Sequence, residues 1–262
     1  MVPHQPDLHL EMTLSDAELD RYARHIVLRE IGGGGQARLL ASHVLLIGAG
    51  GIGSPAIQYL AAAGIGRITV IDDDAVALSN LQRQTLYGTD EVGIAKVAAA
   101  AEAAARLNPG IRFTGMRERI DQANAEVLLG AARPDVVLDG SDNFATRIAV
   151  ADAAHRLRIP LVSAAVAEFE GQLGVFRGWE SGKPCYRCFV GHDPERAEVS
   201  CAEQGVLGAL TGVMGSLAAL EAIRACAPFG EDSAGKLLLV DALALRFRTL
   251  ALPKDPGCSA CC

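Results

Sequence analysis

The sequence contains no run of lysine or arginine, and its acidic residues outnumber its basic ones. Among 262 residues, 24 Lys and Arg stand against 31 Asp and Glu, which gives a formal net charge of −7. A nucleic-acid interface needs a basic face that neutralises phosphates. We therefore predict that nucleic acid is not a partner, although a local group of arginines and backbone N–H donors would suffice to bind a nucleotide.

The sequence also lacks an uninterrupted apolar stretch long enough to cross a membrane. The longest one, residues 206–220, is broken by glycine, threonine and serine, and it predicts a buried helix. Residues 1–12 are polar, contain Pro3 and Pro6, and do not resemble a signal peptide. Seven cysteines without such a signal indicate a reducing compartment, where paired cysteines bind metal or do redox chemistry. We predict a soluble, cytoplasmic protein with no membrane partner.

Apolar runs alternate with helical segments up to residue 165. We predict helices at residues 15–28, 36–41, 54–63, 96–107, 124–132 and 146–157, with glycines 32–35 interrupting the pattern between the first two, and strands at 43–47, 67–72, 111–115, 135–139 and 161–165. Strands joined by crossover helices form a parallel sheet. The fold class is therefore predicted as α/β, with a Rossmann-like, doubly wound and mostly parallel sheet.

The pattern changes after residue 165. Residues 168–179 predict antiparallel pairing without a crossover helix, 184–205 a long polar loop, 208–226 a helix, and 236–241 and 243–249 two closing strands. No linker composition separates the two parts. We predict one domain over residues 1–262, in which a nucleotide-binding half (14–165) is continued by antiparallel strands in a second half (166–262).

A glycine-rich turn follows the first predicted strand. Its glycines, Gly48, Gly50, Gly51 and Gly53, form a G-x-G-x-x-G pattern that opens the next helix, where backbone N–H groups and the helix dipole favour a phosphate. Asp72 ends the next predicted strand and can accept hydrogen bonds from both ribose hydroxyls. These residues alone also fit a NAD-dependent oxidoreductase, which is an alternative from another class of function.

Charged and amide side chains beyond Asp72 favour a different reaction. Asn80, Arg83, Gln84 and Lys96 place two cations and two amides beside the nucleotide crevice. Hydride transfer does not need two cations at the pyrophosphate, whereas expulsion of pyrophosphate does, because charge builds on the leaving group. Asp142 follows the fourth predicted strand, where a carboxylate can hold Mg²⁺ against the phosphates.

Two Cys-x-x-Cys pairs lie in the second half of the chain. They comprise Cys185 with Cys188 and Cys258 with Cys261. Two such pairs can close a tetrahedral Cys₄ zinc site without an open position, which is a structural site. The adjacent Cys262 competes with Cys261 as the fourth ligand.

Taken together, these motifs resemble the MoeB/ThiF/HesA family, the bacterial relatives of ubiquitin-activating enzymes. The resemblance runs from about residue 14 to the C-terminus and rests on Arg21-Tyr-Ala-Arg24, Gly35-Gln36, the glycine-rich turn, Ser79-Asn-Leu-Gln-Arg-Gln84, Gly93-x-x-Lys96, Asp139-Gly-Ser-Asp-Asn143, Cys185-Tyr-Arg-Cys188 and Pro256-Gly-Cys-Ser-Ala-Cys261. It implies ATP-dependent adenylation of the C-terminal glycine of a small ubiquitin-like sulfur carrier. A carrier-binding scaffold without catalysis remains a further alternative.

The resemblance also implies roles for individual residues. Asp72 would hold the ribose, Asn80, Arg83 and Lys96 the phosphates, Asp142 the Mg²⁺, and the four paired cysteines a structural zinc ion. Arg24 would reach the ATP site of the other protomer of a homodimer. Cys201 would form an acyl-disulfide with a ThiS-like thiamine carrier, but would be dispensable with a MoaD-like molybdopterin carrier, which we favour slightly. No sulfurtransferase (rhodanese) domain follows the cysteine pairs, so a separate persulfide donor is expected.

Overall fold

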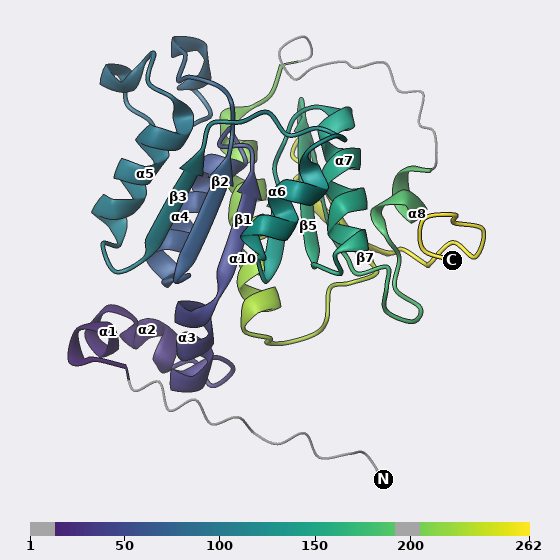
Figure 1. Ribbon diagram of the computed structural model, residues 1–262, viewed down its shortest axis with the longest axis horizontal. Coiled ribbons are helices and arrows are strands. Elements are labelled where there is room, and N and C mark those ends of the chain that lie inside the picture. Colours follow the sequence, from purple (N-terminus) through teal and green to yellow (C-terminus); the bar gives the residue numbers. More distant parts are fainter. Residues whose placement is uncertain (1–13, 192–204) are drawn as a thin grey trace.

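A single eight-stranded sheet runs through the computed structural model, which describes residues 14–191 and 205–262 (Figure 1). The strand order is β3-β2-β1-β4-β5-β6-β7-β8. The first five strands in this order are parallel, and β6, β7 and β8 continue the sheet in antiparallel pairing. The predicted fold class is confirmed. The strands are β1 His43–Ile47, β2 Arg67–Ile71, β3 Arg112–Met116, β4 Val136–Asp139, β5 Leu161–Ala167, β6 Glu170–Phe176, β7 Lys236–Asp241 and β8 Arg246–Ala251.

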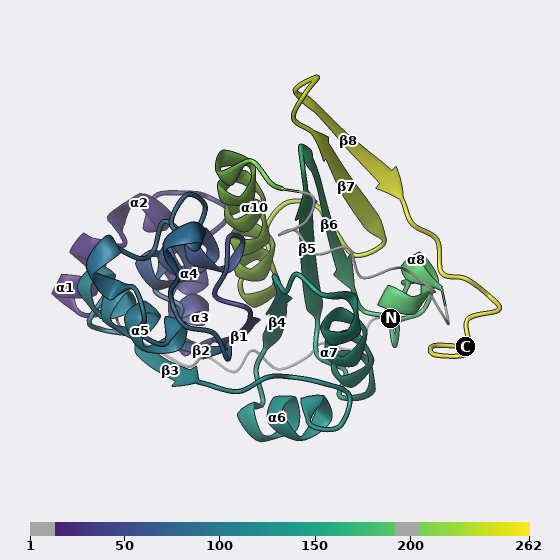
Figure 2. The same cartoon turned by 90° about the horizontal axis from the view of Figure 1, so that it is seen from above.

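Helices cover both faces of the parallel part. One face carries α4 (Gly53–Ala63), α5 (Lys96–Leu107) and α10 (Gly208–Cys226), and the other carries α6 (Ala125–Ala132) and α7 (Phe144–Arg156), as Figure 2 shows. All five residues of β1 are therefore buried, which explains why its sequence is apolar almost without interruption.

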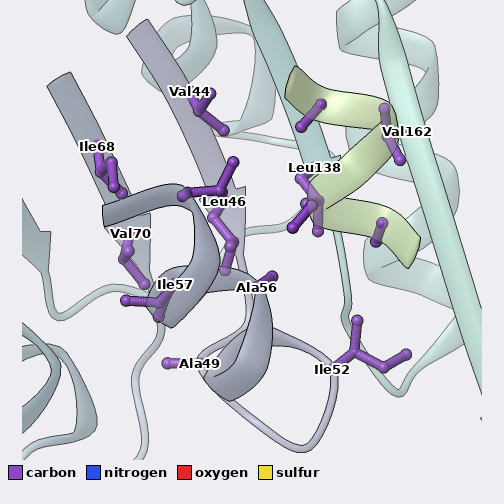
Figure 3. Packing of buried hydrophobic residues seen from close by; sticks show 14 of the residues in the cluster. Val44, Leu46, Ala49, Ile52, Ala56, Ile57, Ile68, Val70, Leu138 and Val162 are labelled. Carbon is purple, nitrogen blue, oxygen red and sulfur yellow. The ribbon is translucent and has the colours of Figure 1, made fainter. Parts of the chain in front are cut away.

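The larger hydrophobic core lies between this sheet and the helices α4, α5 and α10. Val44 and Leu46 of β1 and Leu138 of β4 are fully buried in it. Figure 3 shows that the glycine-rich turn takes part in this core, because Ala49 and Ile52 belong to the same cluster. The turn is thus fixed to the core through its apolar members, while its glycines remain available for a ligand.

The sheet changes its winding direction between β1 and β4. Strand β1 pairs with β2 on one side and with β4 on the other, both in parallel. Loops leaving the carboxyl ends of two such strands diverge and open a crevice between them, where ligands bind in doubly wound folds. The fold therefore places any site between the turn after Ile47 and the turn after Asp139.

The N-terminal prediction of one helix over residues 15–28 is wrong. The structure has α1 (Asp16–Arg21), which Ser15 caps, and a short α2 (Ala23–Ile26) after a break at Tyr22. Tyr22 is buried, and its hydroxyl accepts a hydrogen bond of 2.8 Å from Asn108 Nδ2. Docking this ring against the body of the domain turns the chain where the apolar periodicity alone predicted continuity.

The glycine run also behaves differently from the prediction. Helix α3 (Gly32–Ala41) begins within the four glycines instead of after them. Glycine has low helix propensity, but tertiary contacts override it here. Gln36 of this helix is fully buried, and its Nε2 donates to the carbonyl of Ala63 at 2.9 Å.

In the second half, the helix at 208–226 and the strand at 236–241 agree with the prediction. The last strand begins later than predicted, because Ala244 N–H donates to Asp241 Oδ1 in the connecting turn and Leu245 adopts a positive φ of 49°. The segment 184–205 is not entirely a loop, since α8 (Tyr186–Val190) lies within it. Figure 2 shows the β7–β8 hairpin projecting from the rest of the sheet.

Helix α10 is the one described helix with the length and apolar composition of a membrane span. Its residues Leu210, Met214 and Ala218 are buried in the larger hydrophobic core. The helix packs between α4 and the strands β5 and β6, as the prediction of a buried helix required.

Candidate active site

The turn between β1 and α4 can only be made with glycine at two of its positions. Gly48 has a φ of +84°, and a Cβ at Gly53 would lie 2.0 Å from the carbonyl oxygen of Gly48. Helix α4 starts here with Ile52 at its N-cap, which offers no side-chain hydrogen bond. The helix N-terminus thus keeps the backbone donors and the positive dipole end that favour an anion.

Asp72 ties this turn to the end of β2. One carboxylate oxygen accepts a 2.7 Å hydrogen bond from the N–H of Ala49, and the other accepts 2.9 Å from the N–H of Asp74. Burial raises the pKa of Asp72 above its ordinary value, while the positive charge of Lys96 and the Ala49 donor oppose that rise. A carboxylate has about four acceptor positions, so acceptor capacity remains for ribose hydroxyls.

A cavity of about 240 Å³ lies at the carboxyl edge of the sheet, between these turns. It brings together most of the predicted nucleotide-binding residues. They are Gly48, Gly50, Gly51, Asp72, Arg83, Gln84, Lys96 and Asp142. Gly53 shapes the turn beneath the cavity rather than lining it.

Both predicted cationic side chains, Lys96 and Arg83, lie at the cavity, but they have different partners. Lys96 is buried at the start of α5, and its Nζ is paired with Asp74 Oδ2 at 2.7 Å. Arg83 follows the short helix η1 (Leu78–Asn80), and its Nη1 donates to the carbonyl of Ser79 at 3.1 Å. The ion pair with Asp74 keeps the Lys96 ammonium in the crevice when no ligand is bound. The Asp74 side chain is largely exposed, so it has room to move away when a ligand binds.

Gln84, which lines the cavity, has a side-chain oxygen, Oε1, without a hydrogen-bond partner among the described residues. Its side chain is buried. Buried polar atoms without partners are rare and costly in native proteins. An orphaned acceptor that lines the cavity fits a site that is completed by a bound ligand.

Asp142 stands on the turn after β4, exposed, at the wall of the cavity. Its neighbours in the turn are fixed by the fully buried Asp139, whose Oδ1 accepts from both the N–H and the hydroxyl of Ser141. A Cβ at Gly48 would lie 3.3 Å from the carbonyl oxygen of Gly140, so the glycine-rich turn and the Asp142 turn are in contact. An exposed carboxylate beside a phosphate-binding turn is a hard oxygen donor of the type that Mg²⁺ prefers.

Besides Gly53, two further predicted residues within the described part of the chain do not line the cavity. Asn80 lies on η1, where its backbone carbonyl accepts from the N–H groups of Arg83 and Gln84 at 3.0 and 2.9 Å. It therefore shapes the segment that carries them. Arg24 is exposed on α2. Figure 1 shows α2 beyond the amino ends of the parallel strands, whereas the cavity lies at their carboxyl ends.

Sequence reasoning did not find Arg147 and Thr211, which both line the cavity. Arg147 is buried on α7, within an alanine-rich helix where it resembles an ordinary surface charge. Thr211 lies near the start of α10, 128 residues from Arg83, whose carbonyl oxygen is 3.4 Å from its hydroxyl. The burial of Arg147 becomes visible only in the structure, so the sequence pattern offered no signal for either residue.

The paired cysteines form one cluster. The Sγ atoms of Cys185 and Cys188 are 3.8 Å apart, those of Cys185 and Cys258 3.6 Å, and those of Cys188 and Cys261 3.5 Å. Burial raises the pKa of Cys185 to about 12. Cys262 is exposed and points elsewhere, with its Sγ 3.2 Å from the carbonyl oxygen of Asp255. Cys201 lies outside the described residues.

Comparison with known proteins identifies the family of this fold and site. The model of the ThiF family matches residues 22–260. The chain belongs to the ThiF family. This membership confirms the resemblance inferred from the motifs.

Relatives of this ThiF-family chain match along nearly its whole length. It is 44% identical over 248 residues to the molybdopterin-synthase adenylyltransferase of Escherichia coli, covering 95% of this chain and 98% of the relative. It is 45% identical over 256 residues to the sulfur carrier protein adenylyltransferase of Thermus thermophilus, covering 95% and 93%. A crystal structure of E. coli MccB with ATP shares the fold, with a TM-score of 0.79 and 23% identity over 92% of this chain and 74% of that one.

Proposed function

We propose that this protein uses ATP to adenylate the C-terminal glycine of a small ubiquitin-like sulfur carrier. The observation that carries the proposal is one cavity in which a glycine-rich helix start, two cations and a carboxylate at the switch point of the sheet converge. The names of relatives that are 44 and 45% identical support the same reaction. The fold shared with MccB, crystallised with ATP, supports ATP as the nucleotide.

In the proposed reaction, a carboxylate oxygen of the carrier attacks the α-phosphorus of ATP. The bond from that phosphorus to the oxygen bridging the β-phosphate breaks, and pyrophosphate leaves with the electron pair. Arg83 and Lys96 then face the negative charge that builds on the leaving group, which is where preorganised cations lower a barrier most. Lys96 exchanges Asp74 for phosphate oxygens, and Asp72 accepts from the ribose.

Magnesium would neutralise phosphate charge when bound beside the nucleotide. Asp142 is the residue of this chain that would hold it, since its carboxylate is exposed at the cavity wall. Gln84 Oε1, which lacks a hydrogen-bond partner in the described part of the chain, would accept a hydrogen bond from one of the bound substrates. The glycine-rich turn would bind phosphate oxygens through backbone N–H groups.

Arg24 would complete the site from a second copy of the chain. On its own protomer, helix α2 lies beyond the amino ends of the parallel strands (Figure 1), away from the cavity at their carboxyl ends. A contribution to adenylation therefore requires a homodimer in which α2 of one protomer approaches the cavity of its partner.

The cysteine cluster would hold structural zinc. Four thiolates in a tetrahedron with Zn–S bonds of about 2.3 Å have sulfur atoms about 3.8 Å apart. The sulfur–sulfur separations of 3.5, 3.6 and 3.8 Å in the cluster fit this geometry. Cys261, rather than Cys262, supplies the fourth sulfur in this arrangement. The cluster ties the C-terminal tail to α8, so its role is in folding.

The carrier is proposed to be MoaD-like, with residues 166–262 as the carrier-binding and zinc half and 14–165 as the nucleotide half. The E. coli relative, which is named for molybdopterin synthase, favours that branch over the ThiS-like one. The proposal places the reaction in the cytoplasm, and the sulfur would come from a separate persulfide donor.

Isotope exchange tests the reaction. Label should pass from pyrophosphate into ATP only when a carrier with an intact C-terminal glycine is present. Oxidation of a nicotinamide cofactor would indicate an oxidoreductase instead. If neither activity is found, the protein would be a scaffold without catalysis. Either of these results refutes the adenylation proposal.

Cys201→Ala decides between the two branches. Adenylation needs only phosphate contacts and a positioned carboxylate, so exchange should stay within a few-fold of wild type. With a MoaD-like carrier, sulfur transfer from the persulfide donor should also survive. If the variant keeps exchange but loses sulfur transfer, and if the covalent enzyme–carrier species disappears from a non-reducing gel, the ThiS-like branch is established.

A further inference from the structure

A buried network of polar side chains lies directly beneath the Asp142 turn. Its centre is Asp139, which is completely buried at the end of β4. Asp139 Oδ1 is occupied by Ser141, while Oδ2 accepts from the hydroxyl of Ser163 at 3.3 Å. A buried carboxylate is costly unless a cation and hydrogen bonds compensate its charge. The cation is Arg147, whose Nη1 lies 3.9 Å from Asp139 Oδ2.

Arg147 also holds the turn itself. Its Nη2 donates to the carbonyl oxygen of Ser141, the residue directly before Asp142. Its Nη1 donates to the hydroxyl of Ser163 on β5 at 3.4 Å. The guanidinium thus joins the backbone of the turn after β4 to the neighbouring strand. The flat, branched donor group of arginine allows these contacts at the same time, which the single point charge of lysine does not.

A third element is fixed to the helix that carries Arg147. Tyr186, on α8, is buried. The ring of Tyr186 packs edge-on against Phe176, with centroids 5.2 Å apart. The next residue, Arg187, forms a bidentate pair with Asp152 on α7 at 3.0 and 2.8 Å, which fixes α8 to the helix that carries Arg147.

We propose that Arg147 is a positioning residue that sets the Asp142 carboxylate for magnesium-bound nucleotide, and that the Ser163 hydroxyl keeps the guanidinium in register. The inference rests on the proposed function, because it assigns Asp142 to the magnesium ion. Residues that orient a metal ligand without touching the metal commonly affect metal affinity strongly. The segment that carries two of the clustered cysteines is thereby linked to the nucleotide cavity.

Calorimetric titration with ATP, with and without Mg²⁺, tests the proposal on the full-length protein. Arg147→Lys keeps a positive charge beside Asp139 but loses the contact with the Ser141 carbonyl. We expect its affinity for ATP with Mg²⁺ to fall about 10-fold or more, with the affinity for metal-free ATP within twofold of wild type. A variant that merely disturbs the fold would lose both affinities together.

Ser163→Ala is the second variant, because it removes the hydroxyl that accepts from Arg147 and donates to Asp139. The loss of this contact should lower the Mg²⁺-dependent affinity about fivefold. Arg156→Lys, on the same helix but at an exposed pair with Glu126, is the matched control and should change neither affinity.

Unchanged magnesium-dependent binding in both variants overturns the proposal, and so does an equal loss of metal-free and magnesium-bound affinity. If Arg147→Lys does not fold, Ser163→Ala alone decides. A wild-type protein that binds no ATP at all would refute the proposed function itself, and this inference with it.

Discussion

Adding one methyl group at Gly53 should destabilise the fold, because the methyl group has no room beside the backbone of the glycine-rich turn. In Gly53→Ala, the new Cβ would lie 2.0 Å from the carbonyl oxygen and 3.0 Å from the carbonyl carbon of Gly48. Ordinary van der Waals contact is at about 3.5 Å. The obstructing atom belongs to the backbone, and the N–H of Gly48 is itself bonded to Ile71 O at 3.0 Å, so no flexible side chain can give way.

The expected cost follows from this geometry. Overpacking in a dense core typically costs about 1–3 kcal/mol, and a backbone obstacle places Gly53→Ala at the upper end. For a domain of this size, each kcal/mol lowers Tm by about 2–4 °C. Thermal unfolding should therefore shift down by about 6–12 °C. ATP affinity should fall as well, because relieving the clash moves Gly48 and its neighbouring N–H donors out of the cavity wall.

Gly50→Ala is the matched control in the same turn. Its Cβ would meet only Gln84 Nε2, at 3.6 Å, which is an ordinary contact. We expect its Tm to stay within about 2 °C of wild type, while ATP binding weakens because Gly50 lines the cavity. Differential scanning calorimetry and ATP titration measure both quantities. Equal melting temperatures for Gly53→Ala and wild type would refute the packing argument.

Four further substitutions test the cavity, the cysteine cluster and the run of glycines at residues 32–35. Asp142→Ala should abolish adenylate formation with Tm unchanged, because it removes an exposed carboxylate and no core volume; pyrophosphate exchange near the wild-type rate would contradict it. Arg83→Ala should lower turnover on the order of 100-fold, the scale of losing one preorganised charge, and a loss of less than a few-fold would make Arg83 a surface charge. Purified protein should contain about one zinc per chain, and Cys188→Ser should lower both the zinc content and Tm. Gly34→Ala should raise the free energy of unfolding by about 0.5–1 kcal/mol, because its Cβ meets nothing within 4 Å inside α3.

Cys262→Ser is the control for the metal cluster. Its sulfur lies outside the group formed by the four clustered cysteines, so zinc content and Tm should match wild type. Loss of zinc in this variant, with zinc retained in Cys261→Ser, would exchange the roles of the two residues. Chelation that leaves Tm unmoved would contradict a structural metal altogether.

The sequence by itself determined the elements that local patterns encode. Strand β1 and helix α5 begin and end where predicted, because an apolar run without gaps and a long alanine-rich run ended by Asn-Pro-Gly are signals within one segment. The glycine-rich turn was equally local, since its steric demands arise within a few residues of chain. The break at Tyr22 was not, because its cause is Asn108, 86 residues away.

Only the tertiary structure decided which side chains meet. Lys96 pairs with Asp74, and Arg147 holds the carbonyl of Ser141. No sequence period relates the members of either pair. Parallel strands bring their carboxyl ends to one edge whatever the chain length between them. The sequence could therefore name the edge where the site lies. The orientation of each charge there depends on buried partners contributed by distant segments, and packing alone sets those contacts.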